Sequence, residues 1–206
     1  MHIHRWFTGP AFSSEECDDA LDLALSYTTG DAQVIGSGQK KTVRNKLHRN
    51  CKTAWITREE KSHWLYEKMQ ILFHDCNDNT FKFDLDGGME NIQFLDYPVG
   101  GFFNRHVDNG SDAVARRKLT MIVQLTEPTK YIGGRLRIES MLDNKYASKE
   151  RGSAVVFPSH LWHKAHPVWL GRRQALVAWY SGQFPLRSGT RVWPLWGGQP
   201  RTMKNN

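Results

Sequence analysis

Two side chains that could share one metal ion stand two residues apart at His106 and Asp108. On an extended strand, residues with this spacing project to the same side, so both can reach a single ion. His163, which follows 55 residues after Asp108, could complete the set. Two imidazoles and one carboxylate on one face of an octahedron are the ligands of mononuclear non-haem iron(II) oxygenases, which keep the other positions open for an organic co-substrate and O2. The spacing therefore predicts an iron(II) site.

Arg173 follows ten residues after His163 and suggests what the co-substrate is. A guanidinium is a fixed bidentate partner for a carboxylate, so this arginine could hold the far end of a dicarboxylic acid whose other end binds the metal. We therefore predict 2-oxoglutarate as the co-substrate. Neither feature alone indicates such a site. A lone His-x-Asp triplet is more often a surface turn, and a lone arginine is usually solvated or ion-paired.

The composition bounds the class of protein. The chain has 206 residues, of which 39% are hydrophobic and 12% aromatic, as in a globular protein with one good core, and we predict a single domain over 1–206. Apolar runs such as 154–157 are too short to span a bilayer, and the first residues do not have the pattern of a secretory signal. These features predict a cytoplasmic location, or the host cytoplasm for a viral protein.

The cysteines and the net charge restrict the chemistry and the partners. Cys17, Cys51 and Cys76 are widely separated and form no CxxC pair, which argues against a disulfide framework and a zinc knuckle. The net charge of +7 fits an anionic partner but equally an ordinary basic surface. The basic residues are scattered without a repeated motif, so a nucleic-acid partner is the less favoured interpretation.

The first part of the chain, 1–85, is predicted to be a mostly helical support segment. Ser13 and the acidic residues after it indicate a helix start, with the helix ending near Thr29. A second helix is predicted from about Thr57 to Cys76 because apolar residues recur there at helical spacing. The polar, glycine-containing stretch 36–50 is predicted to be a loop, and it leads to a short strand at 53–56.

From residue 81 the pattern changes to short strand-like runs separated by glycine and proline turns. The predicted strands are 81–85, 91–97, 119–125, 136–139, 153–157 and 174–181. Many short strands with turn signals favour a jelly roll over a repeated βαβ unit. We predict a mostly β fold with N-terminal helices (α+β), a jelly-roll catalytic core over 86–185 and a basic C-terminal tail over 186–206.

The stretch from about Ile92 to Gly182 resembles a known family, the iron(II)/2-oxoglutarate dioxygenases of the prolyl 4-hydroxylase type, particularly small bacterial and phage members. The order and spacing of several motifs carry this resemblance: 93–100, His106-Val-Asp108, 117–125, 131–134, 157–159, His163, 167–168, Gly171 and Arg173. Each motif is weak alone. The resemblance implies a double-stranded β-helix, which is a jelly roll with the metal between its two sheets.

The resemblance also assigns roles and cofactors. It implies that His106, Asp108 and His163 are the iron ligands, that Arg173 anchors the C5 carboxylate of 2-oxoglutarate, and that Tyr97 makes a second contact to that carboxylate. The implied cofactors are Fe(II), 2-oxoglutarate and O2, with ascorbate as a further reductant that such enzymes can use. The implied partner is a peptide or protein substrate.

Some residues depart from the family pattern or compete for a role. Arg135 follows two glycines where relatives often carry glutamate, and Phe103 stands where prolyl hydroxylases frequently have tyrosine; both bear on the substrate and not on the metal. His160 and His166 flank His163 at three residues on either side. We predict His163 as the ligand because it alone satisfies both FPS-x-x-x-H and H-x-x-x-P-V.

The favoured function is hydroxylation of an amino-acid side chain, with peptidyl proline preferred on resemblance alone, coupled to decarboxylation of 2-oxoglutarate to succinate and CO2. Such chemistry needs an enclosed apolar site, and the candidate walls are Val155, Phe157, Trp162 and Trp179. One alternative is the same chemistry on a nucleobase, motivated by the basic charge and the tryptophans. Another is a non-catalytic metal-binding jelly roll that serves protein interaction, although such a module has no need of Arg173.

Overall fold

The computed structural model describes residues 7–32, 34–35, 42–43, 47–110, 114–139 and 144–183. Most of the predicted loop at 36–50 and the whole predicted tail at 186–206 lie outside these residues. No helix in the described ranges has the length and apolar character needed to cross a membrane.

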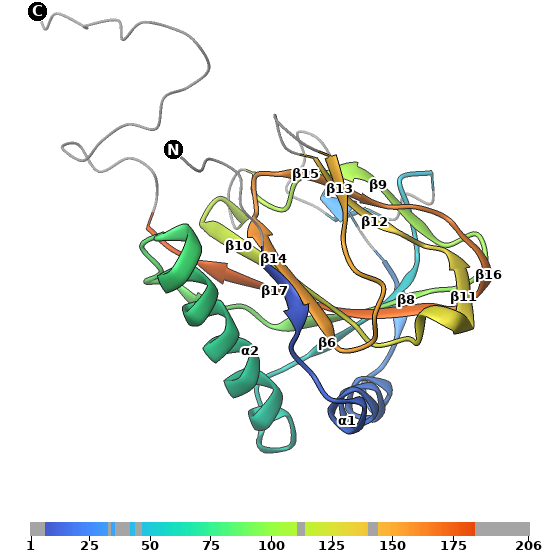
Figure 1. Ribbon diagram of the computed structural model, residues 1–206, viewed down its shortest axis with the longest axis horizontal. Helices are drawn as coiled ribbons and strands as arrows, with labels where there is room; N and C mark the ends of the chain where they lie inside the picture. Colours follow the sequence, from blue (N-terminus) through green and yellow to red (C-terminus); the bar gives the residue numbers. More distant parts are fainter. Residues whose placement is uncertain are drawn as a thin grey trace, which may run out of the picture.

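Two antiparallel sheets form the body of the protein (Figure 1). The major sheet has the strand order β1-β14-β10-β17-β8-β6-β2, with β7 also paired to β17. Its strands are β1 (Phe7–Pro10), β2 (Gly30–Asp31), β6 (Lys52–Ile56), β7 (Gly88–Met89), β8 (Ile92–Tyr97), β10 (Arg117–Gln124), β14 (Ser153–Pro158) and β17 (Arg173–Ser181).

The minor sheet has five strands in the order β13-β12-β15-β9-β5. They are β5 (Arg49–Asn50), β9 (Phe102–His106), β12 (Leu136–Glu139), β13 (Asn144–Tyr146) and β15 (Trp162–Ala165). Two further pairs are β11 (Tyr131–Gly133) with β16 (Val168–Gly171), and β3 (Val34–Ile35) with β4 (Thr42–Val43). The major and minor sheets together are the predicted jelly roll.

Two helices cover the outer side of the major sheet, below it in the view of Figure 1: α1 (Ser14–Leu25) and α2 (His63–Cys76). A 3-10 turn, η1 (Glu60–Ser62), leads into α2, the π-helical turn η2 (Asn77–Phe81) follows it, and the 3-10 turn η4 (Pro128–Lys130) precedes β11. At the start of α1, Ser13 and Glu16 form a reciprocal capping box, which satisfies two backbone N–H groups that the helix leaves free.

The central strands of the major sheet are buried on both faces. On β17, Leu176, Ala178 and Tyr180 belong to the core under the helices. The alternate residues Val177 and Trp179 belong to a second core between the two sheets. Since successive side chains point to opposite faces of a strand, one residue in two on β17 is directed toward the interior of the jelly roll.

The predicted mostly β fold with N-terminal helices is confirmed, and five of the six predicted core strands overlap observed ones. The sixth, at 81–85, is wrong. Phe81 ends the π-helical turn, Lys82 follows with a φ of 59°, and the side chain of Asn77 both donates to the carbonyl of Phe83 and accepts from its N–H. An asparagine thus satisfies the backbone groups that a neighbouring strand would otherwise bind.

The helix predicted to end near Thr29 ends at Leu25. The hydroxyl of Ser26 donates to the carbonyl of Leu23, and the N–H of Tyr27 bonds to the carbonyl of Ala24, three residues back, in place of the helical bond to Leu23. The first 85 residues also supply β1 and β6 to the major sheet, in addition to the predicted helices. Strand β6 overlaps the strand predicted at 53–56.

Candidate metal centre and co-substrate site

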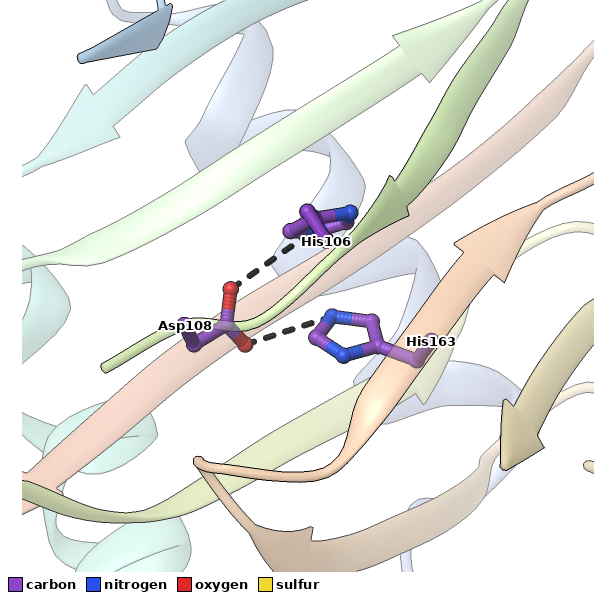
Figure 2. Close-up of side chains that lie close together, drawn as sticks. All are labelled: His106, Asp108 and His163. Carbon is purple, nitrogen blue, oxygen red and sulfur yellow. Dashed lines mark ion pairs between the residues drawn. The ribbon is translucent and has the colours of Figure 1, made fainter. Parts of the chain in front are cut away.

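The side chains of His106, Asp108 and His163 meet between the two sheets (Figure 2). His106 ends β9 and pairs with His163 on the adjacent strand β15, so both imidazoles project from the same face of the minor sheet. Asp108 follows β9 by two residues. Oδ1 of Asp108 lies 3.5 Å from Nε2 of His106, and Oδ2 of Asp108 lies 3.4 Å from Nε2 of His163. Both separations can be spanned by one ion that lies about 2 Å from each ligand atom.

The second nitrogen of each imidazole has a fixed partner. Nδ1 of His106 lies 2.7 Å from the carbonyl oxygen of Asn104, and Nδ1 of His163 lies 3.0 Å from that of Leu161. A carbonyl oxygen can only accept, so both Nδ1 atoms carry a proton, and in the neutral form of each ring the Nε2 atom presents its lone pair to the centre. This is the tautomer that metal-binding histidines need.

The charges at the centre agree with metal binding. Burial lowers the pKa of His163 to about 4, so this imidazole is neutral at physiological pH. Burial alone would raise the pKa of Asp108, but the adjacent imidazoles of His163 and His106 hold it below its usual range, and the group is ionised. Three lone-pair donors with one negative charge converge here, an arrangement that a cation would stabilise. These residues fit a divalent metal ion.

Asp108 is held in place by a small hydrogen-bond network. The hydroxyl of Thr120, on β10, donates to Oδ2 of Asp108 at 2.8 Å and lies 3.0 Å from the hydroxyl of Ser159. The backbone N–H of Asp108 donates to the carbonyl of Ser159 at 2.9 Å. Thr120 and Ser159 are fully buried, so the network fixes the carboxylate orientation without solvent.

Replacing Thr120 by Val should therefore weaken metal binding while keeping the fold. The side chain keeps its shape but no longer donates to Asp108, and removal of such a supporting hydrogen bond typically costs about 10–100-fold in metal affinity. We expect a rise of this size in the dissociation constant for Fe(II), measured anaerobically by competition with a chelator.

The matched control is Thr126→Val, which removes a hydroxyl that accepts from the backbone N–H of Gln174 just beyond the far end of the same strand. Metal affinity should be unchanged in this variant. Equal affinities for the wild type and Thr120→Val, with both proteins folded by circular dichroism, would contradict a positioning role for Thr120.

A cavity of about 920 Å³ connects the three side chains with Arg173. The cavity lies between the sheets and is lined by residues of both, including Tyr97, Trp179 and Arg49. Leu95, Ile122 and Val177 give it apolar walls. A volume of this size is typical of sites for small molecules and exceeds what a single metal ion requires.

Arg173 is only 2% exposed and begins β17. Its Nε donates to Oε1 of Gln124 at 3.1 Å, and its guanidinium lies 5.2 Å from the ring centre of Tyr97, its register partner on β8. Among the described residues no carboxylate forms an ion pair with Arg173. A buried guanidinium whose neighbours are neutral favours an anionic ligand.

Tyr97 is buried beside Arg173, and burial raises the pKa of its phenol above the usual range. The hydroxyl therefore keeps its proton and can act as a hydrogen-bond donor toward a bound carboxylate. The structure thus brings the two predicted co-substrate contacts, Arg173 and Tyr97, together in the cavity that also holds the metal cluster. The roles that the sequence suggests for these five residues stay predictions.

The two departures noted in the sequence lie in different places. Phe103 stacks on the ring of His106 at 3.5 Å between centroids, and the guanidinium of Arg49 lies 4.5 Å from the centre of the Phe103 ring. Phe103 therefore restricts the orientation of His106. Arg135 lies outside the cavity, on the exterior of the jelly roll.

The prediction that Trp162 forms a wall of the site is wrong. Trp162 lies on the outside of the minor sheet and is 43% exposed, and the guanidinium of Arg105 stacks over its ring at 4.0 Å. It precedes the inward-facing His163 by one residue, and adjacent strand residues point to opposite faces. Val155, Phe157 and Trp179 are buried in the core between the sheets, with Phe157 edge-on to His163. His160 and His166 are absent from the described metal cluster.

Sequence reasoning missed Thr120, Gln124 and Ser159 as supporting residues. Thr120 and Gln124 are buried polar residues on β10, four residues apart and hence on the same face, and the three residues between them are apolar. A buried polar residue needs a partner, so this pattern was a signal that the strand faces a polar site.

Sequence similarity to known proteins covers the strands that carry the site. Residues 92–181 match the family model described as the 2OG-Fe(II) oxygenase superfamily. The chain is similar to a PKHD-type hydroxylase of Prochlorococcus marinus (strain MIT 9313), with 28% identity over 160 residues that cover 76% of this chain and 68% of the relative. It is 35% identical to a PKHD-type hydroxylase of Synechococcus elongatus over 95 residues, which are 44% of this chain and 43% of that relative.

Solved structures share the fold. A Pseudomonas putida prolyl-4-hydroxylase superposes with a TM-score of 0.67 at 21% identity, covering 88% of this chain and 94% of that one. A Trichoplax adhaerens prolyl hydroxylase, solved with a peptide fragment of the hypoxia inducible factor oxygen degradation domain, superposes with a TM-score of 0.71 at 20% identity, covering 85% and 83%. At these identities the likeness concerns the fold.

Proposed function

We propose that this chain is a 2OG-Fe(II) oxygenase of the prolyl 4-hydroxylase type that hydroxylates an amino-acid side chain, with a proline in a peptide as the favoured substrate. The family implies that the protein binds Fe(II) as its metal, 2-oxoglutarate as co-substrate and O2 as oxidant. The observation that carries the proposal is the convergence of His106, Asp108 and His163 in the same cavity as Arg173.

The roles of the side chains follow from their chemistry. His106, Asp108 and His163 would hold the metal, and Arg173 with Tyr97 would bind the distal carboxylate of 2-oxoglutarate. When bound, the metal and co-substrate supply an oxidation in which 2-oxoglutarate and O2 become succinate and CO2, with one oxygen atom entering a substrate C–H bond. The apolar walls made by Leu95, Ile122 and Val177 would exclude water from that reaction.

The cavity of about 920 Å³ leaves room for a second substrate beside the co-substrate. Trp55 and Trp179 line it, with ring centroids 6.1 Å apart, and Arg117 lies over the Trp179 ring at 3.9 Å. Flat aromatic faces can pack against a proline ring. The named likenesses to prolyl hydroxylases favour a peptidyl proline, although the same faces could stack a nucleobase.

The test is a coupled assay with two kinds of substrate. Protein loaded with Fe(II) and 2-oxoglutarate should form succinate faster in the presence of proline-rich peptides, and mass spectrometry should find one added oxygen on a proline of the peptide. The same peptides with each proline replaced by alanine should neither stimulate succinate formation nor gain oxygen.

A parallel reaction with single-stranded oligonucleotides separates the two substrate classes. Oxygen added to a base, with peptides left unmodified, would overturn the prolyl proposal and leave the oxygenase chemistry standing. Absence of succinate under all conditions, from protein shown to bind Fe(II), would overturn both.

A further inference from the structure

The outer face of the minor sheet carries a concentration of cations and aromatic rings. The helices α1 and α2 lie on the other sheet, at the opposite side of the molecule (Figure 1). On β12 the side chains of Leu136 and Ile138 are buried in the core between the sheets, so Arg137 and Glu139 point outward. The outer face is thus the reverse side of the strands that carry the two histidines.

The strand register arranges these outward residues in rows. Arg137 lies opposite Tyr146 on one side and Lys164 on the other, and Glu139 lies opposite Trp162. The backbone N–H of His166 donates to the carbonyl of Arg135, which places these two residues at the next position along the ladder. We call the set of Arg135, Arg137, Tyr146, Lys149, Trp162, Lys164, His166 and Trp169 the basic-aromatic face.

One end of the basic-aromatic face is hollowed into a small pocket of about 330 Å³. It is lined by Gly133, Arg135, Tyr146, Lys149, His166 and Trp169. The guanidinium of Arg135 lies 4.0 Å from the centre of the Tyr146 ring, and the ring centroids of Tyr146 and His166 are 5.7 Å apart. Stacking on tyrosine fixes the guanidinium plane and keeps its N–H edges available.

Three polar groups in this pocket have unused bonding capacity. Within the described part of the chain, Arg135 has no acidic partner, and Nε2 of His166 is buried with no hydrogen-bond partner. Lys149 donates to the carbonyl of Tyr131 at 3.3 Å, which leaves other ammonium protons free for a ligand. Buried polar atoms are normally satisfied, so a missing partner points to a ligand.

The cations around the pocket repel one another. Burial lowers the pKa of His166, and the nearby charges of Lys164, Arg137 and Arg135 lower it further. Burial also lowers the pKa of Lys149, with Arg135 adding to the effect. Glu139, the acidic residue of these rows, is engaged by Arg105 at 2.6 Å and lies 3.9 Å from Arg137. An anion in the pocket would relieve this repulsion.

The aromatic residues decide which anion fits. Trp169 is 70% exposed, and Tyr146 and Trp162 are 44% and 43% exposed. Basic side chains with exposed aromatic rings beside them match a single-stranded nucleic acid. Its phosphates can bind the basic side chains, and its bases can stack on the rings. An acidic peptide would use the cations and leave the rings exposed to water.

We propose that the basic-aromatic face binds single-stranded nucleic acid, with a phosphate held by Arg135, Lys149 and His166 and a base stacked on Trp169. The bound strand lies on the exterior of the sheet, away from the metal centre. The proposal is therefore independent of which substrate the oxygenase oxidises.

The test is fluorescence anisotropy with short labelled oligouridylate and oligothymidylate, without Fe(II) or 2-oxoglutarate. The wild type should bind both at low salt, and binding should weaken steeply as salt rises. The double variant Arg135→Glu/Lys164→Glu should bind more weakly, with a salt slope shallower by roughly 0.7 for each phosphate that the variant no longer neutralises. Trp169→Ala should weaken binding by about fivefold to a hundredfold at all salt concentrations, because it removes one stacking surface.

The matched control is Arg58→Glu/Lys82→Glu, which makes the same charge change at exposed residues beside the ends of η1 and η2. It should bind close to wild type, and so should the metal-site variant Asp108→Asn. Three results would overturn the proposal: no binding at low salt, equal weakening in the control variant, or competition by oligoglutamate as strong as by an oligonucleotide of equal charge. The last result would assign the face to an acidic protein partner.

Discussion

Asp108→Asn is expected to eliminate turnover in a protein that remains folded. The amide has nearly the shape of the carboxylate but no charge, so the centre loses its one anionic ligand while the imidazoles of His106 and His163 stay in place. We expect Fe(II) affinity and succinate formation to fall by more than about 100-fold, beyond the range expected when only a supporting hydrogen bond is removed. The visible absorption band of the iron and 2-oxoglutarate chelate should not form under anaerobic conditions.

A matched control comes from the same short segment. His160 lies three residues before His163 and is exposed, and it is outside the described metal cluster. His160→Ala should keep the chelate band and the turnover, whereas His163→Ala should lose both. Thermal unfolding followed by circular dichroism should show both variants folded. Succinate formation at the wild-type rate in Asp108→Asn would refute the ligand assignment.

The metal cluster could be predicted from the sequence because it depends on few structural facts. Period-two alternation places His106 and Asp108 on one side of the chain, and the motifs around His163 separate it from His160 and His166. No knowledge of which strands pair is needed for these steps. The structure then adds that His106 and His163 are register partners, which is why they meet.

The supporting residues could not be predicted in the same way. The hydrogen bond of Thr120 to Asp108 joins β10 of the major sheet to the end of β9 in the minor sheet, and the hydrogen bond between Gln124 and Arg173 joins β10 to β17. Such interactions depend on strand order and register, which sequence periodicity does not specify. The alternation pattern alone could have warned that Trp162 faces outward, since its neighbour His163 was expected to face inward.

The missed strands of the minor sheet have a local cause. β9 and β15 are short, rich in polar residues, and paired with a register shift between them, so they do not show the long, largely apolar runs of β10 or β17. Their polar composition follows from their position, because one face of each strand directs His106 or His163 toward the cavity, while Arg105 on β9 and Trp162 and Lys164 on β15 face outward. The sequence signal for a strand is therefore weakest where the site is built.

Arg173→Ala is expected to raise the requirement for 2-oxoglutarate with much less effect on the maximal rate. The guanidinium is buried, is fixed by Gln124, and has no carboxylate partner in the described part of the chain, so its main loss would be the ion pair with the co-substrate. Truncating one partner of a buried hydrogen-bonded charge pair costs about 2–5 kcal/mol, which corresponds to a KM higher by roughly 30-fold to several thousand-fold. The lysine variant should recover part of this loss, since it restores the charge without the bidentate geometry.

A second co-substrate makes the prediction specific to the distal carboxylate. The wild type should strongly prefer 2-oxoglutarate over 2-oxovalerate, which has the same chain length and no second carboxylate. In Arg173→Ala the kcat/KM ratio of the two acids should collapse toward one, because the residue that distinguishes them is gone. Arg172→Ala is the matched control: this neighbour is 60% exposed and pairs with Asp96, so the preference should persist.

A retained preference in Arg173→Ala would place the carboxylate anchor elsewhere in the cavity. Arg49 would then be the next residue to replace, since it is the other buried arginine among the described lining residues.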